Sequence, residues 1–100
     1  MNILIRFSLL SFALMASSTV LAEKFNPYKC YVLLENNTFA VIDVEVKQKS
    51  LSQASKAAIA EGHKYPGQKV QKVAQVVQCV QRSDEFTDSN ARELDKNKLR

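Results

Sequence analysis

The 100-residue chain has no tryptophan and only two glycines, two prolines and one histidine. It contains no glycine-rich phosphate loop, no Gly-x-Ser-x-Gly turn and no Cys-x-x-Cys pair, which removes the motifs of nucleotide-binding enzymes, serine hydrolases and thiol oxidoreductases. A structural zinc site needs four ligands, and only His63 could join the two cysteines, Cys30 and Cys79. We therefore expect a protein that is not an enzyme and that binds no metal or cofactor.

The first 22 residues have the form of a secretory signal peptide. Arg6 precedes an apolar stretch from Phe7 to Met15, and small residues lead up to Ala22. The stretch is too short and too interrupted for a stable membrane span. Cleavage after Ala22 predicts a periplasmic or secreted protein without a stable span, and an uncleaved N-terminal anchor is the alternative.

Residues 23–100 contain two cysteines, Cys30 and Cys79. A domain of this size buries only about 60% of the surface that its unfolded chain exposes, so a covalent cross-link is expected. Export delivers the thiols to an oxidising compartment, where a disulfide persists. We expect a Cys30–Cys79 disulfide, with two unpaired buried thiols as the alternative.

A β-hairpin is predicted between residues 28 and 48. Asn36-Asn37 separates two β-rich runs, and asparagine tolerates the positive φ of a tight turn. A two-residue loop would place Tyr31 and Leu33 on the face of Ile42, whereas a five-residue loop would place Cys30, Val32 and Leu34 there. The first run is apolar on both faces and the second on only one, which predicts a central first strand and an outer second strand.

A helix is expected between Ser50 and Gly62. Ser50 and Gln53 fit a capping box, and glycine suits the residue that follows a helix. The residues expected to pack on the sheet are Leu51, Ala54, Ala58 and Ile59.

A turn is expected at Tyr65-Pro66-Gly67, followed by a third strand that starts at Gln68 or Lys69 and reaches about Arg82. Its alternation breaks between Val70 and Val73, which predicts a bulge. If the disulfide joins neighbouring strands, the first and third strands run antiparallel and the spatial order is 2-1-3. The predicted fold class is α+β: a β-β-α-β domain over residues 23–82 with a three-stranded mixed sheet, one packed helix and one disulfide.

Residues 83–100 form a polar C-terminal tail. Five acidic residues lie between Ser83 and Asp95, where Arg92 is the only basic residue. A short helix is predicted over Ala91 to Lys98, with its N-cap between Thr87 and Asn90. The tail is expected to be docked or partly frayed, and its possible anchors are Phe86, Ala91, Leu94 and Leu99.

Two surfaces are candidate binding sites. The segment from Lys47 to Lys72 is basic and could bind an acidic partner such as DNA or another polyanion. An ordinary solvated surface has the same composition, and Tyr65 is the only aromatic residue in the segment that could stack on a base. Its lysines are Lys47, Lys49, Lys56, Lys64, Lys69 and Lys72. The outer strand presents Phe39 and Val41 for an edge contact, whereas Lys47 and Lys49 would fit an edge protected from such pairing.

Several short stretches resemble a known family. They are Tyr28-Lys29-Cys30, Val76-Val77-Gln78-Cys79-Val80, Glu85-Phe86-Thr87, Ala91-Arg92-Glu93-Leu94-Asp95-Lys96 and Leu99-Arg100. They resemble small exported Tap-type accessory proteins of type IVa pilus or secretion systems. The resemblance implies an envelope accessory role without catalysis and a partner from the envelope or the secretion system.

The leading hypothesis is thus a non-enzymatic exported accessory protein that acts through a protein contact. One alternative is an inhibitor of an envelope or host enzyme such as lysozyme, for which a net positive charge is a poor electrostatic match to a basic enzyme. The other is an extracellular polyanion binder, whose affinity would fall steeply with salt.

Overall fold

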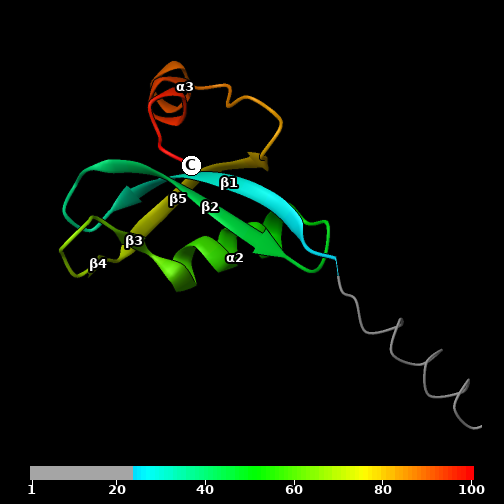
Figure 1. Ribbon diagram of the computed structural model, residues 1–100, viewed down its shortest axis with the longest axis horizontal. Helices are drawn as coiled ribbons and strands as arrows, with labels where there is room; N and C mark the ends of the chain where they lie inside the picture. The colour runs from blue at the N-terminus through cyan, green and yellow to red at the C-terminus, as the bar shows by residue number, and fades with distance from the viewer. Residues whose placement is uncertain (1–23) are drawn as a thin grey trace, which may run out of the picture.

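The computed structural model describes residues 24–100, which form three layers: a sheet lies between helix α2 on one face and helix α3 on the other (Figure 1). The elements in chain order are β1 (Asn26–Leu34), β2 (Phe39–Val46), α2 (Leu51–Glu61), β3 (His63–Lys64), β4 (Val70–Gln71), β5 (Val73–Gln81) and α3 (Ser89–Lys96). The predicted signal peptide, residues 1–22, lies outside this range. Within residues 24–100, no helix is long and apolar enough to cross a membrane.

The main sheet has the strand order β2-β1-β5, which confirms the predicted order and the central position of β1. Both pairs of neighbouring strands are antiparallel, so the expectation of a mixed sheet was wrong. The strands β2 and β5 do run in the same direction, but β1 separates them and they share no hydrogen-bond ladder.

The hairpin adopts the second of the two predicted registers. Cys30 lies opposite Ile42 and Val32 opposite Ala40, so Cys30, Val32 and Leu34 share the face of Ile42. Asn37 takes the positive φ of 67° that the turn requires. This register places the buried even-numbered side chains of β1 and β2 under α2, where they form the larger hydrophobic core.

Helix α2 begins and ends where the capping residues predict. The Ser50 hydroxyl accepts a hydrogen bond from the Gln53 N–H, and the Gly62 N–H donates to the Ala58 carbonyl. Ala54 and Ala58 are fully buried against the sheet, so helix and sheet approach closely. Leu51 and Ile59 are more than half exposed, and their predicted packing on the sheet was wrong because the two alanines define the packed face.

The third predicted strand is divided in two. Residues 70–71 form β4, which pairs with β3 in a separate two-stranded sheet around the Tyr65-Pro66-Gly67 turn. The chain leaves this pairing at Lys72 and enters β5 at Val73. The ladder between β1 and β5 shifts register twice, which leaves Val77 and Ala74 as the extra residues of two bulges on β5.

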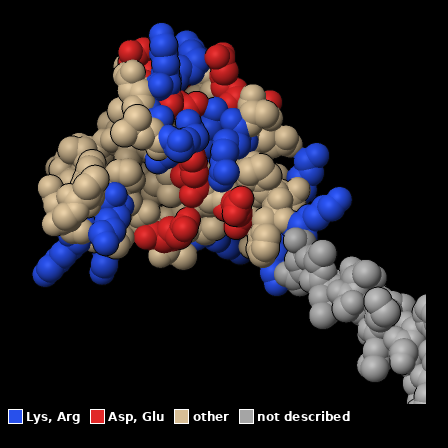
Figure 2. All heavy atoms as spheres, in the orientation of Figure 1, with Lys and Arg blue, Asp and Glu red and all other residues tan. Residues whose placement is uncertain are grey.

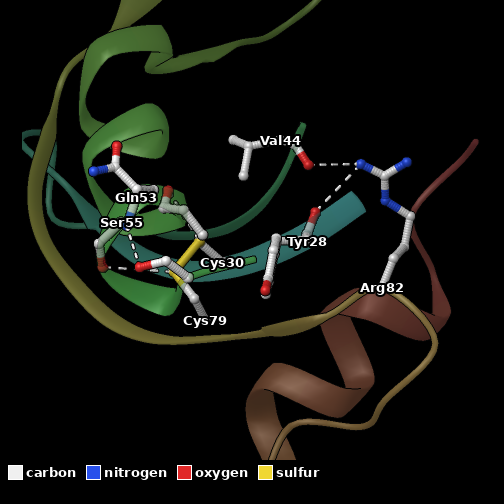
Figure 3. The surroundings of a disulfide bond; sticks show 9 residues. Tyr28, Cys30, Val44, Gln53, Ser55, Cys79 and Arg82 are labelled. Carbon is white, nitrogen blue, oxygen red and sulfur yellow. Dashed lines mark hydrogen bonds between the residues drawn. A yellow bond between two sulfur atoms is a disulfide. The ribbon is translucent and has the colours of Figure 1, made fainter. Parts of the chain in front are cut away.

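Cys30 and Cys79 form a disulfide, as predicted, between directly opposed residues of β1 and β5 (Figure 3). Helix α2 covers the bond: Cys30 Sγ lies 3.7 Å from the Ala54 carbonyl oxygen, and the Ser55 hydroxyl donates to Cys79 Sγ at 3.6 Å. The bond therefore fixes β5 to the central strand inside the main core. It closes a sequence separation of 49 residues, for which the chain-entropy model gives about 4 kcal/mol of stabilisation.

Candidate functional site

The face of the sheet opposite α2 carries a second, smaller core. Odd-numbered side chains of β1 and β2 point to this face, because side chains alternate along a strand. Tyr31 and Val41 pack there with Phe86 and Ala91 from the C-terminal segment. Helix α3 has eight residues, or roughly 12 Å, and cannot cover strands of about 30 Å. Part of the apolar face therefore stays open.

The open part is a groove of about 760 Å³ between α3 and the hairpin end of the sheet. Each strand of the main sheet and α3 contribute to its lining, which consists of Tyr31, Leu33, Thr38, Phe39, Gln75, Val77, Asp88, Asn90, Glu93 and Leu94. Its two charged residues, Asp88 and Glu93, are both acidic. The groove thus combines an apolar floor with a negative rim in a chain whose formal net charge is +4.

Exposed apolar side chains dominate this groove. Phe39, Val77 and Leu94 are 45%, 48% and 39% exposed. The Phe39 ring stacks on Tyr31 with 5.1 Å between ring centroids, and Tyr31 is itself buried. A partner that covered these side chains would gain apolar burial at about 25 cal/mol per Å², on a floor that is already ordered.

Ion pairs that include one buried lysine hold α3 in place. Lys29 projects from the same face of β1 as Tyr31, is 4% exposed, and donates to Asp95 Oδ2 at 2.6 Å. Its ammonium also lies 5.3 Å from the centre of the Phe86 ring. Arg100 donates to both Asp43 and Asp95, which ties the last residue of the chain to β2 as well as to α3. The groove wall formed by α3 is therefore fixed by charge-assisted hydrogen bonds.

Two pKa shifts reflect this packing. Burial, and then the charge of Asp88, raise the pKa of Tyr31, so its hydroxyl stays protonated at neutral pH. Burial alone would raise the pKa of Asp95, but hydrogen bonds and charges from Lys29 and Arg100 outweigh it and lower that pKa. Asp95 is therefore ionised at neutral pH and keeps its partners.

The predicted edge contact is only partly available. Phe39 is exposed and lines the groove, but the side chain of Val41 is 4% exposed because it packs in the core beneath α3. The interpretation of Val41 as an exposed contact was wrong, because the C-terminal segment covers the outer face of β2 at Val41 while Phe39 and Glu45 on the same face stay exposed. The Val41 carbonyl, at the strand edge, accepts a hydrogen bond from Lys98 Nζ at 3.0 Å.

The six predicted patch lysines are all exposed, but they do not come from one surface element. Lys47 and Lys49 follow β2 at one end of the molecule and Lys56 lies on α2, whereas Lys64, Lys69 and Lys72 belong to the β3–β4 region at the other end (Figure 1). On the face drawn in Figure 2, basic side chains form separate groups with acidic ones between them. Lysines that are close together in the sequence are therefore separated in the fold.

His63 is the one histidine of the sequence. His63 is half-buried and contacts the Tyr65 ring edge-on, and burial, followed by the charge of Lys98, lowers its pKa. Among residues 24–100, no group of three or more His, Cys, Asp or Glu side chains is placed to hold a metal ion.

Sequence reasoning did not identify the groove. Leu94 was predicted to anchor the tail, and no contact was predicted for Val77 or Lys29. Leu94 and Leu99 are in fact exposed, and Phe86 and Ala91 are the residues that anchor the tail. One available signal was Lys29 itself, a lysine inside a strand that is apolar on both faces, together with an acidic tail that could pair with it.

The fold and the groove define a small, disulfide-linked α+β domain with an open apolar surface. The chain belongs to the TapY2-like family of type IVa secretion system proteins, because the family model described as "Type IVa secretion system protein TapY2-like" matches residues 5–100. This match confirms the resemblance to Tap-type proteins and extends it through α2 and the Tyr65-Pro66-Gly67 turn. No curated protein and no solved structure matches the chain significantly.

Proposed function

We propose that this protein is a non-enzymatic accessory component of a type IVa secretion or pilus system, located in the periplasm or secreted, and that it binds a protein partner through the α3 groove. Membership of the TapY2-like family supports the link to the secretion system. The signal-like segment at residues 1–22 and the Cys30–Cys79 disulfide support export.

The observation that carries the proposal is the exposed apolar floor of the groove. Phe39, Val77 and Leu94 lie exposed around one hollow, next to a helix that ion pairs hold in place. A rigid surface loses little conformational entropy on binding, which favours recognition of another protein. Aromatic anchors in such a hollow are typical of binding hot spots.

The test is site-specific photo-crosslinking in cells that export the protein. A photoreactive phenylalanine analogue at Phe39 should form an adduct with a component of the secretion system, identified by mass spectrometry. The matched control is the same analogue at Ile59, which is also exposed but lies on α2, on the other side of the sheet. Equal adducts from both positions, or none from Phe39, would count against the groove.

One observation favours a second candidate, an inhibitor of a basic envelope or host enzyme such as lysozyme. The groove has an acidic rim formed by Asp88 and Glu93, so its local charge suits a basic enzyme better than the net charge of the chain does. Inhibition of purified lysozyme that is lost in Glu93→Lys would support this function, and lysozyme activity unchanged by excess protein would remove it.

A further inference from the structure

We propose that the partner supplies an extended segment that pairs with the free edge of β5 as a fourth strand and places side chains in the α3 groove. This inference rests on the proposed function and specifies how the occupant of the groove is held. Strand addition to an exposed sheet edge is a recurring mode of peptide recognition, in which main-chain hydrogen bonds give affinity and adjacent pockets give specificity.

The register shows which backbone groups of β5 are directed outward. Cys30 and Cys79 are directly opposed, with 4.1 Å between their Cα atoms, which is the short spacing of a non-hydrogen-bonded antiparallel pair. The N–H and C=O of Cys79 therefore point away from β1. Among the described residues, no strand pairs with that side of β5.

The other edge supports this assignment of direction. By the same alternation, Cys30 and Ile42 form a hydrogen-bonded pair, so the N–H and C=O of Ile42 face β1. The carbonyl of the adjacent residue of β2, Val41, therefore points away from β1. Lys98 Nζ donates a hydrogen bond to that carbonyl, which is possible because the carbonyl is not bonded to β1.

The two edges differ in how they are protected. The β2 edge carries Lys98 on its backbone and has Asp43 and Glu45 within the strand and Lys47 after it, which are charges that discourage pairing with another strand. The β5 strand contains no charged residue and no proline over its nine residues. It is therefore the edge that can accept a partner strand.

The bulges on β5 set the length and position of the contact. A regular ladder with β1 covers Gln78 to Gln81, and the chain departs from it at Val77. An added segment would thus pair over a few residues around Cys79. Val77 lies at the end of this run and lines the α3 groove, so the free edge and the groove are continuous.

The lining specifies the chemistry of the added segment. Side chains on the α3 side of a new strand would contact Val77 and the apolar floor, so apolar residues at alternate positions are expected. Asp88 and Glu93 at the rim favour at least one lysine or arginine beside them. We infer an extended partner segment with alternating apolar residues and a flanking basic residue.

The experiment selects peptides of about 12 residues from a random phage-display library on the folded protein and then measures amide hydrogen exchange by NMR. A selected peptide should slow exchange of the Cys79 amide about tenfold or more, because it gains a hydrogen bond on binding. The Val80 amide is the internal control, since Val80 belongs to the hydrogen-bonded pair with Lys29 and faces β1.

Substitutions provide the matched test. Val77→Lys adds a charge to the edge and should weaken peptide binding roughly tenfold. Val70→Lys changes an equally exposed valine on β4, away from the edge, and should leave affinity unchanged. Both variants must show the wild-type unfolding midpoint.

The outcomes separate this inference from the proposed function. Peptides that perturb Phe39 and Leu94 without protecting the Cys79 amide would overturn strand addition and leave groove binding intact. Selection of no peptide, or of acidic peptides insensitive to Val77→Lys, would overturn both. Protection of the Cys79 amide that rises with protein concentration in the absence of peptide would assign the edge to a second copy of the chain and overturn the partner segment.

Discussion

Asp95 holds two cations at once, Lys29 from the central strand and Arg100 from the C-terminal end. Lys29 has a side chain that is only 6% exposed, so its ammonium depends on Asp95 for charge compensation. Removing one partner of a buried ion pair leaves the other charge without compensation, which costs more than the pair contributes. Asp95 therefore joins α3 to β1 and to Arg100, in addition to the apolar packing of Phe86 and Ala91.

We predict that Asp95→Asn lowers the free energy of unfolding by about 3 kcal/mol at pH 7. The pKa of Asp95 is lowered by folding, so its contribution is fully present above about pH 4 and is lost as the pH falls through the folded-state pKa. The gap between wild type and variant in urea unfolding should therefore narrow on acidification to about pH 3. Glu93→Gln, on the same helix, is the control, and an equal gap at both pH values would contradict the role of Asp95.

At this scale, the sequence predicted chemically distinctive residues best. The disulfide, the Ser50 cap and the left-handed Asn37 all follow from residue types with one dominant use. The burial of Lys29 and Val41 could not be predicted from the sequence, because it depends on which distant segment packs over them. The alternation pattern shows which side chains share a face, but not what covers that face.

At the scale of elements, strong local signals gave α2 and the hairpin, whereas β3 and β4 have two residues each and no periodicity to detect. Gly62 joins α2 to this small sheet with φ 68° and ψ −168°, a conformation essentially restricted to glycine. A Cβ atom at Gly62 would lie 2.7 Å from the Gln71 carbonyl oxygen and 2.7 Å from Val70 Cγ1. Gly62 therefore serves both the helix end and the β3–β4 pairing.

We predict that Gly62→Ala destabilises the protein by about 1–3 kcal/mol. The positive φ is unfavourable for alanine, and the new methyl group would also clash with the backbone of Gln71. Gly67→Ala is the matched control: its φ is also positive, at 74°, but nothing lies within 4 Å of the added Cβ. Its cost should be limited to backbone strain of roughly 1 kcal/mol. Denaturant unfolding of both variants measures the difference, and equal losses would show that the clash at Gly62 is relieved.

At the scale of the whole molecule, the sheet is a two-sided platform with a disulfide and α2 on one face and a shorter helix on the other (Figures 1 and 3). The predicted strand order was correct because the cysteines and the two-sided apolar β1 constrain it. The groove was not predicted, because it results from a mismatch in length after packing: an eight-residue helix is less than half as long as the strands of eight or nine residues that it packs on. The lysines of the basic run between Lys47 and Lys72 are close together in the sequence, but in the fold they lie after β2, on α2 and in the β3–β4 region (Figure 1).

The proposed binding surface is the groove and not the exposed face of α2. Phe39 and Leu94 form one pair of exposed apolar side chains, and Leu51 and Ile59 form a comparable pair on the opposite layer. This symmetry allows two double variants with similar chemistry, Phe39→Asp with Leu94→Asp and Leu51→Asp with Ile59→Asp. Both must be exported at wild-type level and keep the wild-type unfolding midpoint.

The most direct measurement is complementation of type IVa-dependent secretion in a strain that lacks the protein. The groove variant should reduce secretion about tenfold or more, since buried acidic groups would replace apolar contacts with the partner, and the α2 variant should restore it fully. Full restoration by the groove variant, or equal loss with both variants, would contradict the assignment of function to the groove.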